Sequence, residues 1–93
     1  MVSPQVEYKG SFVSGQKSGQ GVDLYKRTGD RFEGEFKEGM RDGKGTYFFA
    51  DGRRICINFV KNEMHGIGEY FASPDAAPAR VLFENGKHVK FLS

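Results

Sequence analysis

The segment FEGEFKEGMRDGKGTY, residues 32–47, determines the fold predicted for this chain of 93 residues. Its first five residues alternate rings or glycine with charged side chains, which is the period of a β-strand with one apolar face. Glycines then interrupt the pattern, and a second strand-like run follows. Two short strands separated by turn residues predict one β-hairpin.

The same pattern lies on both sides of this hairpin. Its apolar and glycine positions recur 24 residues earlier, beginning at Tyr8, and 23 residues later, beginning at Ile55. Such a period predicts a repeat protein, in which each hairpin buries its apolar face only against its neighbours. We expect one domain over residues 1–93, with repeats at about 8–31, 32–54 and 55–78 and a terminal half repeat, or cap, at about 79–93.

Strand and turn chemistry together predict an all-β chain without helices. Short connections favour an antiparallel meander of about eight strands. The fixed glycines of residues 15–19 and 39–43 predict loops with φ > 0, followed by short second strands at 22–25, 46–49 and 69–71. Asn85 and Gly86, between two apolar runs, predict a type I′ turn.

Composition narrows the class of protein. The net charge of +2 is too small to indicate a nucleic-acid-binding domain. Cys56 is the only cysteine, so an intrachain disulfide is excluded and an intracellular setting is favoured. The first residues lack a signal-peptide pattern, and no run reaches membrane-spanning length. We therefore expect a cytoplasmic protein.

Strand parity places a set of aromatic rings on one face. The simplest interpretation of any single ring is core packing. A single-layer sheet, however, has no second layer to cover this face, and a contiguous exposed apolar patch usually marks an interaction surface. We therefore predict both core and protein-binding groove for eight residues: Tyr8, Phe12, Phe32, Phe36, Tyr47, Phe59, Tyr70 and Phe83.

The spaced pattern Tyr/Phe-x-Gly-x-Phe-x-x-Gly-x-x-x-Gly-x-Gly-x-Tyr resembles the MORN (membrane occupation and recognition nexus) repeat from Tyr8 to about Phe83. The resemblance implies an elongated, twisted, single-layer antiparallel sheet of stacked hairpins with an aromatic groove. It also implies a scaffold or docking role at cytoskeletal, ciliary or membrane-associated sites, and phospholipid binding has been proposed for some members.

Some positions depart from this pattern. Asp23 stands where later repeats carry Tyr47 and Tyr70, and Ile57 stands where earlier repeats carry Gly10 and Gly34. Glycine leaves space above the backbone for a neighbouring ring or a partner side chain. The sequence therefore predicts a groove that is deeper in the first two repeats.

A second apolar row, Leu24, Phe48 and Phe71, has the opposite parity from the tyrosines. Either a bulge redirects these side chains to the ring-bearing side, or they form a stripe on the other face. Such a stripe, or the unpaired first strand, makes a homodimer one of the states we consider.

Five basic residues lie near the expected turns between repeats: Lys26, Arg27, Arg31, Arg53 and Arg54. Solvated turns are the simpler interpretation, and contact with phosphate or anionic lipid is the alternative.

Catalytic and metal chemistry find no support. His65 and His88 are isolated, and their separation of 23 residues follows the repeat. Glu33 and Glu35 share a strand face that parity exposes to water. We expect no enzyme activity, no cofactor and no metal.

The predicted function is a non-enzymatic scaffold that docks an extended or helical segment of a protein partner in the aromatic groove. The first alternative is an adaptor that binds anionic phospholipid surfaces through the basic turns. The second is a structural, dimerising end of a longer repeat array. Cytoskeletal or membrane association within the cytoplasm fits each of them.

Overall fold

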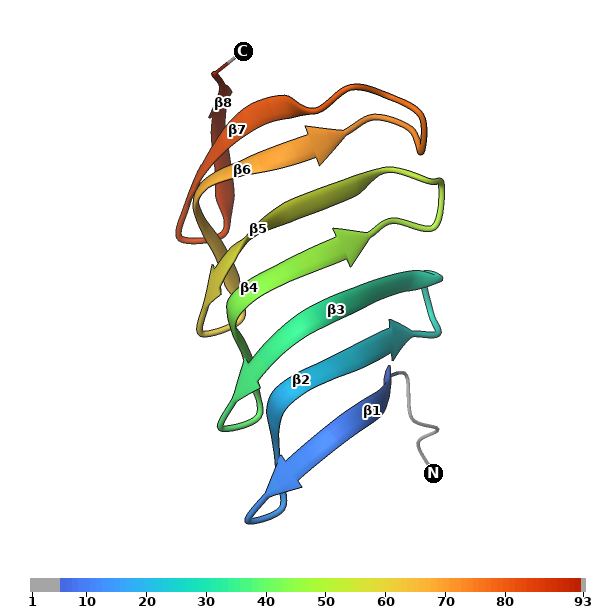
Figure 1. Cartoon of the computed structure of the whole chain (residues 1–93), viewed down its shortest axis with the longest axis vertical. Helices are drawn as coiled ribbons and strands as arrows, with labels where there is room; N and C mark the ends of the chain where they lie inside the picture. The colour runs from blue at the N-terminus through green and yellow to red at the C-terminus, as the bar shows by residue number, and fades with distance from the viewer. Residues whose placement is uncertain (1–5, 93) are drawn as a thin grey trace.

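The computed structural model describes residues 6–92, which form one antiparallel sheet of eight strands (Figure 1). The strands are β1 (Val6–Val13), β2 (Gln16–Tyr25), β3 (Asp30–Lys37), β4 (Met40–Phe48), β5 (Arg54–Val60), β6 (Glu63–Phe71), β7 (Ala79–Glu84) and β8 (Lys87–Phe91). Each strand pairs with the next one in the chain. The described residues contain no helix, so the predicted all-β meander of stacked hairpins is confirmed.

The two strands of each repeat, such as β1 and β2, are joined by a turn of two residues. Ser14 and Gly15 have φ angles of 52° and 80°, and both central residues of the three later turns also have positive φ. This is the backbone of a type I′ turn, whose twist matches the flanking strands, and the turn predicted at Asn85 and Gly86 is confirmed. The positive φ predicted for the glycines of residues 15–19 and 39–43 is confirmed, but the loops predicted there are wrong, because β2 and β4 begin directly after the turns.

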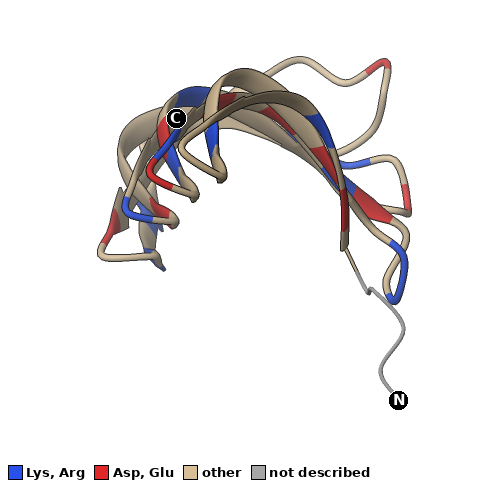
Figure 2. Ribbon diagram, turned by 90° about the horizontal axis from the view of Figure 1, so that it is seen from below, with Lys and Arg blue, Asp and Glu red and all other residues tan. Residues whose placement is uncertain are grey.

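One glycine within the second strand of each of the first three hairpins has a different role from the glycines of the turns. Gly19, Gly43 and Gly66 have φ angles of 73°, 111° and 87° and lie inside β2, β4 and β6. At these points the pairing register shifts, so that some residues of the second strand have no partner residue on the first strand of the hairpin. Bulges of this kind bend a strand and increase its twist. Figure 2 shows the resulting arched sheet.

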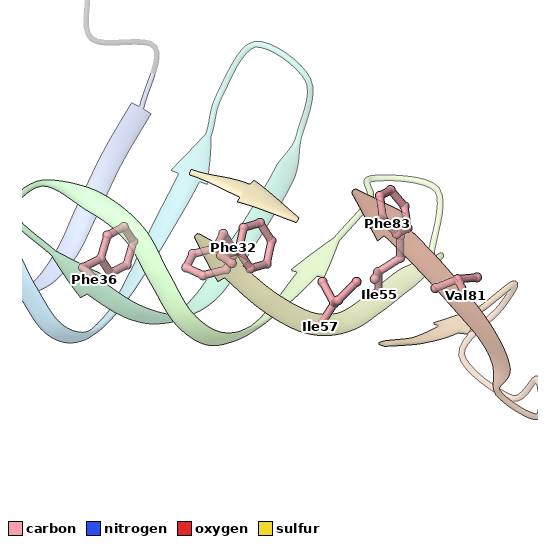
Figure 3. Packing of buried hydrophobic residues seen from close by; sticks show 7 residues of the cluster. Phe32, Phe36, Ile55, Ile57, Val81 and Phe83 are labelled. Carbon is pink, nitrogen blue, oxygen red and sulfur yellow. The ribbon is translucent and has the colours of Figure 1, made fainter. Parts of the chain in front are cut away.

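The core occupies one side of the sheet, which we call the ring face. It contains Phe32, Phe36, Ile55, Ile57, Phe59, Val81 and Phe83 (Figure 3). Phe32 is 0% exposed, although the described residues provide no second sheet or helix to cover it. Side chains from neighbouring strands of the same face therefore close over the rings, and a single layer builds its own core.

Two equivalent rings offer a matched test of this core. Phe36 is 4% exposed, whereas Phe12, at the same position of the preceding repeat, is 59% exposed. Phe36→Ala should lower the free energy of unfolding by about 3–5 kcal/mol, the usual cost of truncating a buried Phe. Phe12→Ala should change it by no more than about 0.5 kcal/mol, as is typical of surface substitutions. Urea unfolding in dilute solution measures both, and equal losses would contradict this account of the core.

Candidate functional site

Rings of neighbouring repeats pack edge to face along the ring face. Tyr8 of the first repeat lies 5.1 Å from Phe36 of the second, measured between ring centroids. Phe32 of the second repeat lies 4.9 Å from Phe59 of the third in the same way. Within a repeat, the Phe32 and Phe36 rings are 5.3 Å apart. The rings thus form a continuous zigzag that joins the first three repeats.

The predicted groove residues divide into two groups by exposure. Phe32, Phe36, Phe59 and Phe83 are buried core residues, whereas Tyr8, Tyr47 and Tyr70 are partly exposed and Phe12 is exposed. In this structure the buried four offer no surface to a partner, because neighbouring side chains cover them. The accessible members of the predicted set are therefore the three tyrosines and Phe12.

The space above the motif glycines is already occupied. A Cβ atom added at Gly34 would lie 2.8 Å from the Phe32 ring and 2.6 Å from the Cα of Gly45. The Tyr8 ring lies in the same way over Gly10 and Gly21. The deeper groove predicted in the first two repeats is therefore wrong, since a ring of the same repeat fills each space.

A row of longer side chains, which we call the lid row, covers the rings from the second strand of each hairpin. Each member is paired across the hairpin with a phenylalanine: Lys17 with Phe12, Arg41 with Phe36, Met64 with Phe59 and His88 with Phe83. The guanidinium carbon of Arg41 lies 5.2 Å from the Phe59 centroid and 5.7 Å from the Phe32 centroid. Such cation–π contacts hold the charge over the rings.

Asp23 is a buried charge within this apolar surface. It is 3% exposed, and its carboxylate accepts a hydrogen bond of 3.0 Å from Lys17 Nζ and one of 3.2 Å from the Tyr25 hydroxyl. The Tyr25 hydroxyl in turn accepts a bond of 3.3 Å from Arg41 Nη1. A buried charge is costly unless it is paired and hydrogen-bonded, and here both conditions are met. The sequence showed only that Asp23 replaces the tyrosine of later repeats, and its role as a buried, paired carboxylate was missed.

Four partly exposed rings form the accessible border of the core, and we call them the tyrosine strip: Tyr25, Tyr47, Phe49 and Tyr70. Tyr25 and Tyr47 stack with centroids 5.8 Å apart, and Tyr47 contacts Phe49 at 5.0 Å. The Tyr47 hydroxyl donates a bond of 2.9 Å to Asp30 Oδ2. These contacts hold the rings of Tyr25, Tyr47 and Phe49 in place, and each of these rings stays partly exposed.

The environment of the strip changes the ionisation of two tyrosines. Burial, together with the hydrogen bond and negative charge of Asp30, raises the pKa of Tyr47 to about 12. Burial also raises the pKa of Tyr25; Asp23 adds to this rise, and the positive charge of Arg41 opposes it. Both hydroxyls therefore stay protonated, and remain donors, well above neutral pH.

The row of Leu24, Phe48 and Phe71 lies on the opposite side of the sheet, which we call the polar face. Its cross-strand register runs Leu24, Arg31, Phe48, Arg54, Phe71. The guanidinium carbon of Arg31 lies 4.2 Å from the Phe48 centroid, and that of Arg54 lies 3.8 Å from the Phe71 centroid. The bulges lie elsewhere in the strands, so the interpretation as a stripe on the other face is correct.

The predicted basic residues do not form one concentrated patch. Arg31 Nε lies 2.9 Å from Glu33, and Arg53 Nε lies 2.8 Å from Asp51, whose pKa the Arg53 contacts hold below its usual range. Lys26 lies 3.9 Å from Glu7. Figure 2 likewise shows basic and acidic positions interspersed along the sheet. Arg54 stacks on a ring, and Arg27 is exposed.

An open depression of about 880 Å³ lies on the polar face. Charged and polar side chains from β1 to β6 line it, among them Lys9, Glu33, Lys44 and Glu69. Glu35, also in its lining, accepts a bond of 2.8 Å from the Lys44 backbone N–H. Within residues 6–92 no cluster of His, Cys, Asp and Glu could hold a metal ion, and no helix could cross a membrane.

The raised tyrosine pKa values predict an alkaline transition. Unfolded tyrosines ionise near pH 10. A pKa that is higher in the folded state gives stability that is complete below about pH 10 and is lost as the pH rises through about 12. A titration of tyrosinate absorbance should show late ionisation, and Tyr47→Phe should remove part of this late component.

The control is the same titration in urea, where all four tyrosines should ionise together near their ordinary pKa of about 10. If Tyr47→Phe instead removed absorbance that develops near pH 10 in the folded protein, the environment described for Tyr47 would be wrong.

Comparison with known proteins agrees with the repeat structure. The sequence model of the MORN repeat matches residues 8–22, 32–53 and 58–73. The chain is also similar to MORN repeat-containing protein 3 of Xenopus laevis, at 32% identity over 73 residues. The aligned region covers 72% of this chain and spans 31% of that relative. MORN repeats are in general non-enzymatic modules of protein or membrane interaction. Because the repeat matches cover more than half of the residues, the chain belongs to the MORN repeat family.

Proposed function

We propose that this chain is a non-enzymatic scaffold module that docks an extended or helical segment of a partner protein along the tyrosine strip. One observation carries the proposal: a row of partly exposed aromatic rings borders the buried core on the ring face. The docking surface is therefore narrower than the eight-residue groove expected from the sequence.

The physical basis is that these rings are ordered before a partner arrives. Tyr47 is held by its stack on Tyr25 and its bond to Asp30, so little side-chain entropy remains to be lost on binding. Tyrosine offers a large apolar surface with a polar tip, and it is enriched in protein interfaces and their hot spots. The strip thus combines apolar contact with hydrogen bonding.

Charges beside the strip provide a means of orienting a partner. The guanidinium carbon of Arg53 lies 4.7 Å from the Phe49 ring, and Arg53 is paired with Asp51. Charges at the rim of an interface mainly determine orientation and association rate. We expect the module to act in the cytoplasm, at cytoskeletal or membrane-associated sites.

Photo-crosslinking tests the docking surface directly. A photoreactive phenylalanine analogue at Tyr70 should capture a partner from cell extract, and an excess of untagged chain should suppress the crosslink. The same analogue at Lys44, on the polar face, is the control and should capture markedly less. The captured protein, once purified, should bind the wild-type chain and should compete for the crosslink at position 70.

Capture through position 44 alone would place the partner in the polar-face depression and would contradict docking on the strip. Circular dichroism should show the same sheet signal for both labelled proteins, because neither site is in the buried core.

Binding to anionic lipid is the second candidate function, and the exposed Lys26 and Arg27 in the loop between β2 and β3 favour it. Each basic residue near an anionic surface contributes about 1 kcal/mol. Because Arg31 and Arg53 are already paired with carboxylates, we expect co-sedimentation with phosphatidylserine vesicles at low salt only. Charge reversal with Lys26→Glu and Arg27→Glu should abolish this weak binding. Binding that persisted at physiological salt would instead support the lipid adaptor.

A further inference from the structure

One phenylalanine of the ring face, Phe12, lacks the cover that its equivalents in later repeats have. Phe36, Phe59 and Phe83 are 4%, 2% and 9% exposed, whereas Phe12 is 59% exposed. Phe36 is covered by Tyr8 of the preceding repeat, and Phe59 is covered by Phe32 in the same way. No repeat precedes Phe12 within residues 6–92, so its outer side is open.

The strand that carries Phe12 is also open along its edge. β1 is the first strand of the sheet and pairs only with β2 among the described strands. Its eight residues contain no proline, and Val6 and Val13 are 39% and 61% exposed. An edge strand with unpaired backbone groups and exposed apolar side chains is a template for pairing with another strand.

We propose that two copies of this chain join through antiparallel pairing of their β1 strands, about a twofold axis at Gly10. This register places Phe12 opposite Tyr8 of the partner subunit, and Tyr8 opposite Phe12 of the partner subunit. Because the two positions differ from Gly10 by an even number of residues, both ring faces lie on the same side of the joined sheet. A twofold interface of this kind is self-complementary.

The same register suits the other side chains of β1. Phe12 already contacts Tyr8 of its own chain, with centroids 5.0 Å apart, so pairing would complete a cluster of four rings. On the polar face it sets Glu7 opposite Val13 and Lys9 opposite Ser11, and no like charges meet. Cross-strand aromatic pairs stabilise a sheet, whereas directly opposed like charges destabilise it.

The other edge of the sheet is less suited to this role. β8 has five residues, and Lys87 and Lys90 are among them. Short edge strands and lysine side chains are the usual protection against edge pairing. β8 also exposes Val89 and Phe91, but β1 is longer, with eight residues against five, and this length favours pairing of β1 with β1 over pairing of β8 with β1.

Sedimentation equilibrium tests the proposal on the 93-residue chain, whose mass is 10.4 kDa. The wild type should show twice this mass at high concentration, and Phe12→Ser should show the mass of one chain. Phe91→Ser is the matched control. Phe91 is 55% exposed, a fraction similar to that of Phe12, but it lies on the opposite edge of the sheet, so this variant should remain dimeric. A monomeric wild type at all concentrations, or a dimer lost only in Phe91→Ser, would overturn the proposal.

Hydrogen exchange gives a second measurement that needs no variant. On raising the concentration, amides of β1 should gain protection, while those of β8 should stay unchanged. Gains confined to β8, or no change in β1, would overturn pairing through β1. Far-UV circular dichroism checks that Phe12→Ser keeps the sheet, so loss of the dimer is not mistaken for loss of the fold.

Discussion

The contact between the ring of one repeat and the ring of the next is the constraint on which this structure depends. An isolated hairpin cannot bury one face of its own strands. Here Tyr8 covers Phe36 and Phe32 covers Phe59, so each repeat supplies the cover for its neighbour. The backbone reinforces the same junctions, since the N–H groups of Gly39, Asn62 and Gly86 donate to carbonyls of the preceding lid row.

The glycines follow from this ring packing. Phe32 can lean over the sheet because Gly34 and Gly45 have no side chain beneath its ring. In the third repeat both partners change together, since Ile55 replaces the ring and Ile57 fills the space above Gly68. Cores tolerate exchanges that keep apolar volume constant. The departure from the repeat pattern at Ile57 is thus a compensated repacking of the core.

The sequence predicted the sheet, the repeat period and the face of each ring, because alternation and glycine spacing are local signals. It did not predict burial, because the arch arises from bulges at Gly19, Gly43 and Gly66, and a bulge glycine resembles a loop glycine in sequence. Lys17 and Arg41 were missed because long cations usually face water. Their repeated position opposite a phenylalanine was the available signal.

Packing and the proposed recognition use different rows of the ring face. The buried rings hold the repeats together, whereas the rings of the tyrosine strip are only partly buried, so we expect substitutions there to cost less stability than substitutions in the core. In a repeat array, stability comes from each repeat and from its contacts with its neighbours. The first repeat has one described neighbour, and it contains the exposed Phe12. Any strand that binds to β1 would stabilise this repeat by mass action, so assembly at this edge and the order of the first hairpin are linked.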